Sequence, residues 1–197
     1  LRAQIKYAAV TLIFPHPVGA SLQIHPSRPY AGLAVLQNNH LVVFQIENNA
    51  FLETGDLYCR IVTIHNDIAC AAFAQGDRIV GYCKSNGRFM GWNLVDIFAG
   101  RALNVQPEFD IETDSGTTTI WHLLIHRNQL LLNGADGVVR LYDLHNLQQP
   151  PDLFQDKVTK VKLASSDVSG NGEFVVAGAN GVDDNDKYGI YIWNANT

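Results

Sequence analysis

Four stretches of the chain repeat one pattern of hydrophobic and polar positions. In each, a short hydrophobic run leads to a turn that contains Asn or Gly, and a second run then ends in an aromatic residue followed by a polar one. The stretches are 30–47, 77–95, 128–145 and 173–196. Because the runs are rich in β-branched and aromatic residues and lack a 3.6-residue period, the pattern predicts β-hairpins rather than helices.

The aligned aromatic residues give the period of the repeat. In order they are Phe44, Trp92, Tyr142 and Trp193. Their separations of 48, 50 and 51 residues are close to the ~40–50 residues of propeller repeats. We expect these structural aromatics to pack between sheets, and the polar residue that follows each to support a turn. On this interpretation Asp143 preserves the Trp-Asp pattern of WD repeats, whereas Asn93 and Asn194 leave only the aromatic part.

Each hairpin is preceded by another predicted strand, and outer strands are expected within 52–64 and 100–111. The preceding strands are 19–26, 67–75, 117–126 and 158–172. Four strands per repeat predict an all-β fold, a β-propeller of degenerate WD repeats over residues 1–197. The expected repeats are roughly 11–57, 58–108, 109–155 and 156–197. We expect these four blades to be part of a seven-bladed ring, with both chain ends inside it.

Composition narrows the class of protein further. The 197 residues carry a formal net charge of −5 and no basic run, so the chain lacks the charge that a non-specific nucleic-acid binder needs. No hydrophobic run approaches the ~20 residues of a membrane-spanning helix. Cys59, Cys70 and Cys83 form no CxxC pair, which disfavours a disulfide framework or a zinc site. We expect a globular protein of a reducing compartment, with Cys70 and Cys83 buried in strands.

The candidate catalytic and metal-binding residues have simpler structural explanations. His122 and His126 would share one face of a helix, but on a strand they lie ~13 Å apart, too far for one ion. His25 lies at the end of a predicted strand and is expected to be a turn or packing histidine. The segment 169–174 lacks a phosphate-binding pattern and precedes a strand, so its residues 169–172 are expected to form a turn. We therefore expect no catalytic residue, no metal and no cofactor.

The acidic segment 182–187 is the candidate binding loop. It contains Asp183, Asp184 and Asp186. An EF-hand loop that began at Asp183 would need Gly at its sixth position, where this chain has Tyr188. Two interpretations remain for the three carboxylates: a solvated loop, or a partner-binding site for a basic peptide such as a histone tail.

Three patches resemble the WD-repeat subunit of COMPASS-type histone methyltransferase complexes, called retinoblastoma-binding protein five in animals and Swd-one in yeast. Residues 14–26 are similar to the start of that family's third blade, and 136–143, preceded by 117–126, to its fifth. The strongest similarity lies in 169–197. The positions that match there are Gly170, Gly172, Glu173, Phe174, Val175, Val176, Ala177, Gly178, Tyr191, Ile192 and Trp193. The chain departs from the animal pattern in loop 182–187 and over 45–115.

The resemblance implies a non-catalytic scaffold in a nuclear chromatin complex that methylates lysine four of histone three. Its expected partners are the SET-domain, SPRY-domain and second propeller subunits, with contact to nucleosomes or histones and no membrane or small-molecule substrate. The family's extended tail is absent from these 197 residues, so functions of that tail are not carried over. The alternative is a WD-repeat scaffold of another assembly, namely a vesicle coat, a ubiquitin-ligase adaptor or a ribosome-biogenesis complex.

Overall fold

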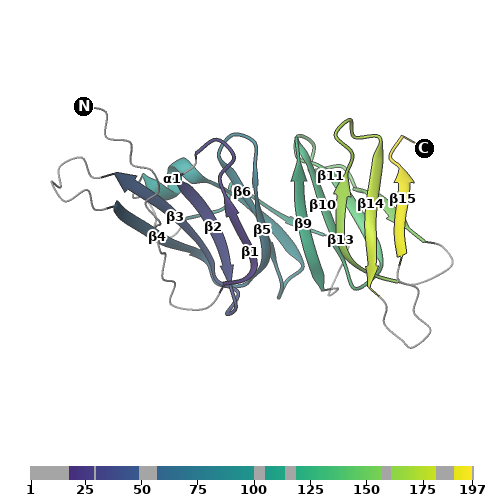
Figure 1. Cartoon of the computed structure of the whole chain (residues 1–197), viewed down its shortest axis with the longest axis horizontal. Helices are drawn as coiled ribbons and strands as arrows, with labels where there is room; N and C mark the ends of the chain where they lie inside the picture. The colour runs from purple at the N-terminus through teal and green to yellow at the C-terminus, as the bar shows by residue number, and fades with distance from the viewer. Residues whose placement is uncertain are drawn as a thin grey trace, which may run out of the picture.

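The described part of the chain forms four antiparallel β-sheets that follow one another in chain order, as the computed structural model shows (Figure 1). The residues described are 18–28, 30–48, 57–99, 105–113, 119–156, 161–180 and 189–196. Within each sheet every strand pairs with the strand next to it in sequence. Three four-stranded meanders and one of three described strands follow one another and pack face to face. This arrangement forms a β-propeller, which confirms the predicted fold class.

The first two sheets contain four strands each. The first consists of β1 (Val18–Ile24), β2 (Ala31–Leu36), β3 (Leu41–Asn48) and β4 (Leu57–His65). The second consists of β5 (Ile68–Ala74), β6 (Arg78–Cys83), β7 (Arg88–Asn93) and β8 (Phe109–Glu112), with the short helix α1 (Leu94–Phe98) after β7. Strands β4 and β8 confirm the two expected outer strands, since β4 pairs with β3 and β8 pairs with β7.

The third sheet repeats this four-stranded arrangement, and the described part of the fourth contains three strands. The third consists of β9 (Ile120–His126), β10 (Gln129–Gly134), β11 (Val138–Asp143) and β12 (Asp152–Gln155). The fourth consists of β13 (Lys162–Val168), β14 (Phe174–Asn180) and β15 (Gly189–Asn194). The expected repeat limits at 57/58 and 108/109 coincide with the starts of β4 and β8. The expected limits therefore assign β4 to the second repeat and β8 to the third, although in the structure these strands belong to the first and second sheets.

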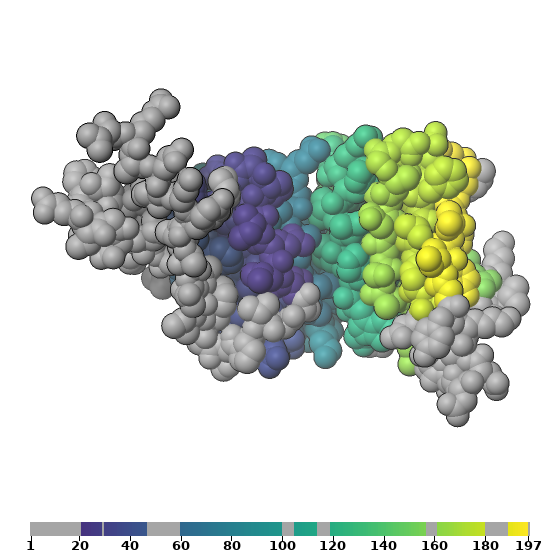
Figure 2. Space-filling view, in the orientation of Figure 1, coloured from purple at the N-terminus to yellow at the C-terminus, as the bar shows by residue number. Residues whose placement is uncertain are grey.

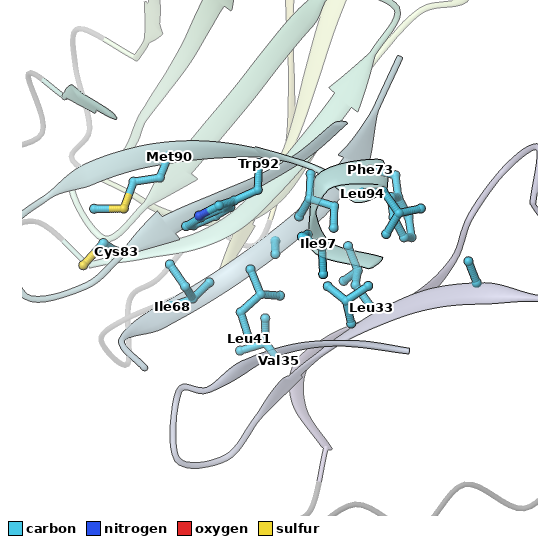
Figure 3. Packing of buried hydrophobic residues seen from close by; sticks show 14 residues of the cluster. Leu33, Val35, Leu41, Ile68, Phe73, Cys83, Met90, Trp92, Leu94 and Ile97 are labelled. Atoms are coloured by element: carbon cyan, nitrogen blue, oxygen red, sulfur yellow. The ribbon is translucent and has the colours of Figure 1, made fainter. Parts of the chain in front are cut away.

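Most of the hydrophobic core lies at the junctions between sheets, and a small further cluster of Ala34, Leu36 and Val42 lies within the first sheet. One cluster joins the first and second sheets, another the second and third, and a further one the third and fourth. At each junction the aromatic residue of the later sheet's third strand takes part: Trp92, Tyr142 and Trp193 in turn. Figure 3 shows Leu33, Val35 and Leu41 of the first sheet directed at Ile68, Trp92 and Ile97 of the second.

The structural aromatics differ in how deeply they are buried. Phe44 and Trp92 expose 1% and 0% of their surface, and Tyr142 exposes 4%. Trp193 is only partly buried, and it lies 5.7 Å from the ring of Tyr191 and 6.2 Å from that of Phe154. The first three therefore have core environments, while Trp193 packs at the margin of the last cluster.

The polar residues after Trp92, Tyr142 and Trp193 all make the same turn hydrogen bond, whether they are Asp or Asn. The Oδ1 atoms of Asn93 and Asn194 accept hydrogen bonds from the backbone N–H two residues on, at 2.9 and 2.8 Å. Asp143 makes the same contact with the N–H of His145, at 2.9 Å. The expectation that Asn keeps only the aromatic part of the pattern is therefore wrong, because a side-chain amide oxygen accepts this bond as a carboxylate does. At Asn93 the bond caps α1, a helix that the sequence pattern did not predict.

Candidate interaction site

The acidic candidates cannot be placed in this fold. Asp183, Asp184 and Asp186 lie outside the described residues, between β14 and β15. Their role in partner binding stays a prediction.

His25 is a turn histidine that also faces the neighbouring sheet. Its Nδ1 accepts hydrogen bonds from the backbone N–H groups of Ser27 and Arg28, at 3.2 and 3.0 Å. Its Nε2 lies 3.0 Å from Oδ1 of Asp77, although the N–H is not aligned for a hydrogen bond. Burial lowers the pKa of His25, against the opposing effect of the Asp77 carboxylate. The ring is therefore neutral at pH 7 and holds the β1–β2 turn.

Asp77 completes an ionic contact between the first and second sheets that sequence reasoning missed. The guanidinium of Arg28 donates to both carboxylate oxygens of Asp77, with 3.0 Å between Nε and Oδ1. Asp77 has a φ of 61° in the β5–β6 turn, a left-handed conformation that Asp tolerates better than most residues. The only available signal was the turn position of Asp77, since its partner lies 49 residues earlier in the chain.

The two histidines of β9 do not act as a pair. His122 accepts a weak hydrogen bond at Nδ1 from the N–H of Ser166 in β13, at 3.4 Å, and burial lowers its pKa. His126 is half-buried, and its Nε2 has no hydrogen-bond partner. Across the described ranges, no three His, Cys, Asp or Glu side chains gather in a way that could hold a metal ion.

A cavity of about 160 Å³ lies where the first strands of three sheets meet. We call it the inner-strand pocket. Its lining residues are Ser21, Leu22, Gln23, Cys70, Trp121, His122 and Leu123, from β1, β5 and β9. Leu22 and Trp121 expose 59% and 38% of their surfaces. An exposed indole beside an exposed aliphatic side chain is suited to contact an apolar group of a partner.

The polar lining of the pocket is fixed and uncharged near neutral pH. The Oγ of Ser21 accepts from the N–H of Ala71 at 3.2 Å, and Oε1 of Gln23 accepts from that of Phe73 at 3.1 Å. These bonds connect β1 to the free edge of β5. Burial raises the pKa of the Cys70 thiol to about 12, so it stays protonated and is a poor nucleophile. The pocket is therefore suited to binding rather than to covalent chemistry.

The predicted burial of two cysteines is confirmed. Cys70 and Cys83 expose 3% and 2% of their surfaces, and both thiols are free. Within the described ranges, no helix combines the length and the hydropathy needed to cross a bilayer.

Comparison with known proteins supports the fold. No protein-family model matches the sequence, and no curated protein matches it either. Among solved structures, the chain is similar to the β-propeller domain of Cps50 (Swd1) from Myceliophteria thermophila, with a TM-score of 0.69 and 18% sequence identity. The similarity covers 94% of this chain and 58% of that one. At this identity the comparison shows a shared propeller fold, and the chain spans less than two thirds of its structural neighbour.

Proposed function

We propose that this chain is part of the WD-repeat propeller of a scaffold subunit in a COMPASS-like complex that methylates lysine four of histone three. The observation that carries the proposal is the structural similarity to the Cps50 (Swd1) propeller, which extends over 94% of the chain. The sequence patches at 14–26, 136–143 and 169–197 support it independently, because they resemble the Swd-one family in order and spacing. The subunit would act in the nucleus.

The proposed role is to hold partners rather than to catalyse a reaction. A propeller offers a rigid set of packed sheets, from which loops and pocket walls present contacts to other proteins. The inner-strand pocket supplies an apolar contact through Leu22 and Trp121. The carboxylates of Asp183, Asp184 and Asp186 would attract a basic segment of a partner or a histone tail. In this proposal the methyl transfer belongs to the SET-domain subunit.

Affinity purification of the full-length protein at mild ionic strength, followed by mass spectrometry, tests the assignment. We expect a SET-domain protein, a second propeller protein and a SPRY-domain protein to be recovered together. Recovery of vesicle-coat, ubiquitin-ligase or ribosome-assembly factors without those three would contradict the assignment and favour the alternative scaffold.

The acidic loop can be tested separately with a basic peptide that copies a histone tail. The variant carries Asp183→Asn, Asp184→Asn and Asp186→Asn. We expect its association rate with the peptide to fall about tenfold at low salt, because electrostatic steering accelerates association. A control variant with the same charge change, at exposed positions elsewhere, carries Asp96→Asn, Asp152→Asn and Glu173→Gln. Equal losses in both variants would mean that net charge, rather than the loop, governs binding.

A further inference from the structure

The first strand of every sheet carries a bulge at the same place. In β5, β9 and β13 one extra residue stands between two residues that pair with neighbouring positions of the second strand, and in β1 there are two. The extra residues are Gly19 and Ala20, Ala69, Trp121 and Ala164. Three sheets place only small residues here, so the fold does not require a tryptophan. Because a bulge re-aims its side chain and Trp121 exposes 38% of its surface, we interpret this residue as a contact for a partner.

Side chains of the first strands also satisfy N–H groups at the edge of the next sheet. The Oγ of Ser21 accepts from the N–H of Ala71 at 3.2 Å, and Nδ1 of His122 accepts from the N–H of Ser166 at 3.4 Å. Ser21 and His122 are each the first residue after the bulge, while Ala71 and Ser166 are each the second. The first residue after one bulge thus supplies the acceptor for the second residue after the next bulge.

The junction between the second and third sheets lacks this acceptor. The first residue after its bulge is Cys70, and the N–H in question belongs to Leu123. By the same register this N–H points from the free edge of β9 toward β5. A protonated thiol is only a weak acceptor, and among the described residues no other side chain accepts from Leu123. Both residues line the inner-strand pocket, so an occupant that supplies a hydrogen-bond acceptor is stabilised there.

The other lining residues restrict the chemistry of the occupant. Ser21 and Gln23 use their side-chain oxygens to accept from edge N–H groups, which leaves their O–H and N–H groups to donate. The seven lining residues include no Lys or Arg, and the carboxylate of Asp167 acts on His122, so a negatively charged occupant is disfavoured. A cavity of ~150 Å³ can hold a benzene molecule, so the pocket of about 160 Å³ holds one group of that size. These properties favour a planar, uncharged amide.

We propose that the inner-strand pocket binds an amide group of a partner peptide, whose carbonyl oxygen accepts from the N–H of Leu123 while its plane packs on the ring of Trp121. Figure 1 shows β1, β5 and β9 side by side near the middle of the molecule, and in Figure 2 the purple surface of β1 and the green surface of β9 lie on the same face. A backbone amide and the side-chain amide of Asn or Gln share this chemistry. The proposal does not depend on the histone methyltransferase complex, so purification results that contradict that complex leave it unchanged.

A titration of the full-length protein, labelled with ¹⁵N at leucine, tests the proposal. The probe is N-methylacetamide, and acetate is the charged comparison. The resonance of Leu123 is assigned by its loss in Leu123→Ile. We expect this resonance to shift saturably with N-methylacetamide, and the dissociation constant for acetate to be at least about tenfold larger. Absence of a saturable shift at Leu123, or equal affinity for acetate, would overturn the proposal.

One variant tests the hydrogen bond. Cys70→Ser places a hydroxyl at the position that Ser21 occupies in the first sheet, so its oxygen should accept from the N–H of Leu123. We expect it to weaken binding of N-methylacetamide about tenfold. Cys83→Ser is the matched control, because Cys83 is equally buried but lies outside the pocket, and its affinity should be unchanged. Equal affinities of the two serine variants would overturn the proposal.

A second variant tests the contact with the indole. Trp121→Ala gives β9 the residue that β5 and β13 have at the bulge, so the variant should fold. Unchanged resonances of leucines remote from the pocket check that it does. We expect binding of N-methylacetamide to weaken about two- to tenfold, because a packed aromatic ring contributes about that much to a contact. An unchanged affinity in the folded variant would contradict the proposed site.

Discussion

The junction between the second and third sheets differs in chemistry from the junction between the third and fourth. In the former, the small side chains Cys70, Ala72 and Ala74 of β5 face the third sheet, and Phe89 packs on Tyr142. The latter contains a buried polar group: Asn133, with no exposed surface, contacts β13 through hydrogen bonds. One propeller thus uses both an apolar and a polar solution for the same sheet-to-sheet contact.

The junction between the third and fourth sheets depends more strongly on exact geometry than the junction between the second and third. The amide nitrogen of Asn133 donates to the carbonyl of Leu163 at 2.7 Å, and its oxygen accepts from the hydroxyl of Ser166 at 2.6 Å. Buried polar groups need partners in a fixed geometry, whereas apolar contacts tolerate small shifts. The two types of junction should therefore respond differently to truncation and to pH.

The largest expected effect is at the apolar junction. Phe89→Ala removes a ring with no exposed surface and should lower the free energy of unfolding by about 3–5 kcal/mol. Urea denaturation monitored by far-UV circular dichroism measures the loss. Phe174→Ala, at a position of β14 that exposes 44% of its surface, is the matched control. A loss under about 1 kcal/mol for Phe89→Ala would contradict the packing described for this junction.

The next effect is at the polar junction. Asn133→Ala leaves the carbonyl of Leu163 and the hydroxyl of Ser166 without their partner, which should cost about 1–3 kcal/mol for each buried group left unpaired. Ser166→Ala removes one side of the second bond. Because the two residues share it, the double variant should lose less stability than the sum of the single losses. Strict additivity in a double-mutant cycle would argue against a functional contact between them.

Regular hydrophobic patterning made the strands and the third-strand aromatics predictable, but not the contacts between sheets. Alternation along β1 favours burial of Leu22 and Ile24 over Ser21 and Gln23. The structure shows the reverse, because the polar side chains turn to the free edge of β5 and satisfy its N–H groups, while Leu22 and Ile24 stay exposed. Such contacts join residues 50 positions apart. They depend on how one sheet is set against the next, which no local pattern encodes.

The same limit applies to the polar residues that fix turns. The Asn after an aromatic gave no obvious signal for a helix, yet Asn93 caps α1 through the N–H of Val95. Asp77 carried a turn signal but none for its contact with Arg28. Local chemistry therefore predicts that a turn exists, while the partner that the turn residue meets follows from the assembled sheets.

As the pH falls, stability should first be lost at His25, between the first and second sheets, and at His122, between the third and fourth. The carboxylates titrate only at lower pH. Burial lowers the pKa values of His25 and His122 below their ordinary 6.5, so below that pH the unfolded chain binds protons that the folded chain resists. The stability from the neutral rings is complete above pH 6.5 and falls as the pH drops toward their folded pKa values. Protonation at Nδ1 of His25 also removes the acceptor for the N–H of Arg28, and protonation at Nδ1 of His122 removes the acceptor for the N–H of Ser166.

Unfolding free energies measured at intervals between pH 8 and pH 5 check this dependence. The double variant His25→Gln/His122→Gln should show a flatter profile over that range than the unmodified chain. Asp67 provides the contrast: hydrogen bonds from Ser85 lower the pKa of its carboxyl, so its contribution falls only below its ordinary 3.8. An unchanged slope between pH 7 and pH 5 in the double variant would place the titrating group elsewhere.

The smallest expected effect is at the ionic contact between the first and second sheets. The side chain of Arg28 exposes 47% of its surface, so water and salt screen its interaction with Asp77. Arg28→Gln should therefore cost only about 0.2–1 kcal/mol, and the difference should shrink as NaCl is raised toward 1 M. Asp77→Asn should cost a similar amount, since an amide at 77 still occupies the β5–β6 turn. A larger, salt-independent loss for Arg28→Gln would mean that its N–H groups fix the geometry of both turns, as Asn133 does for the buried junction.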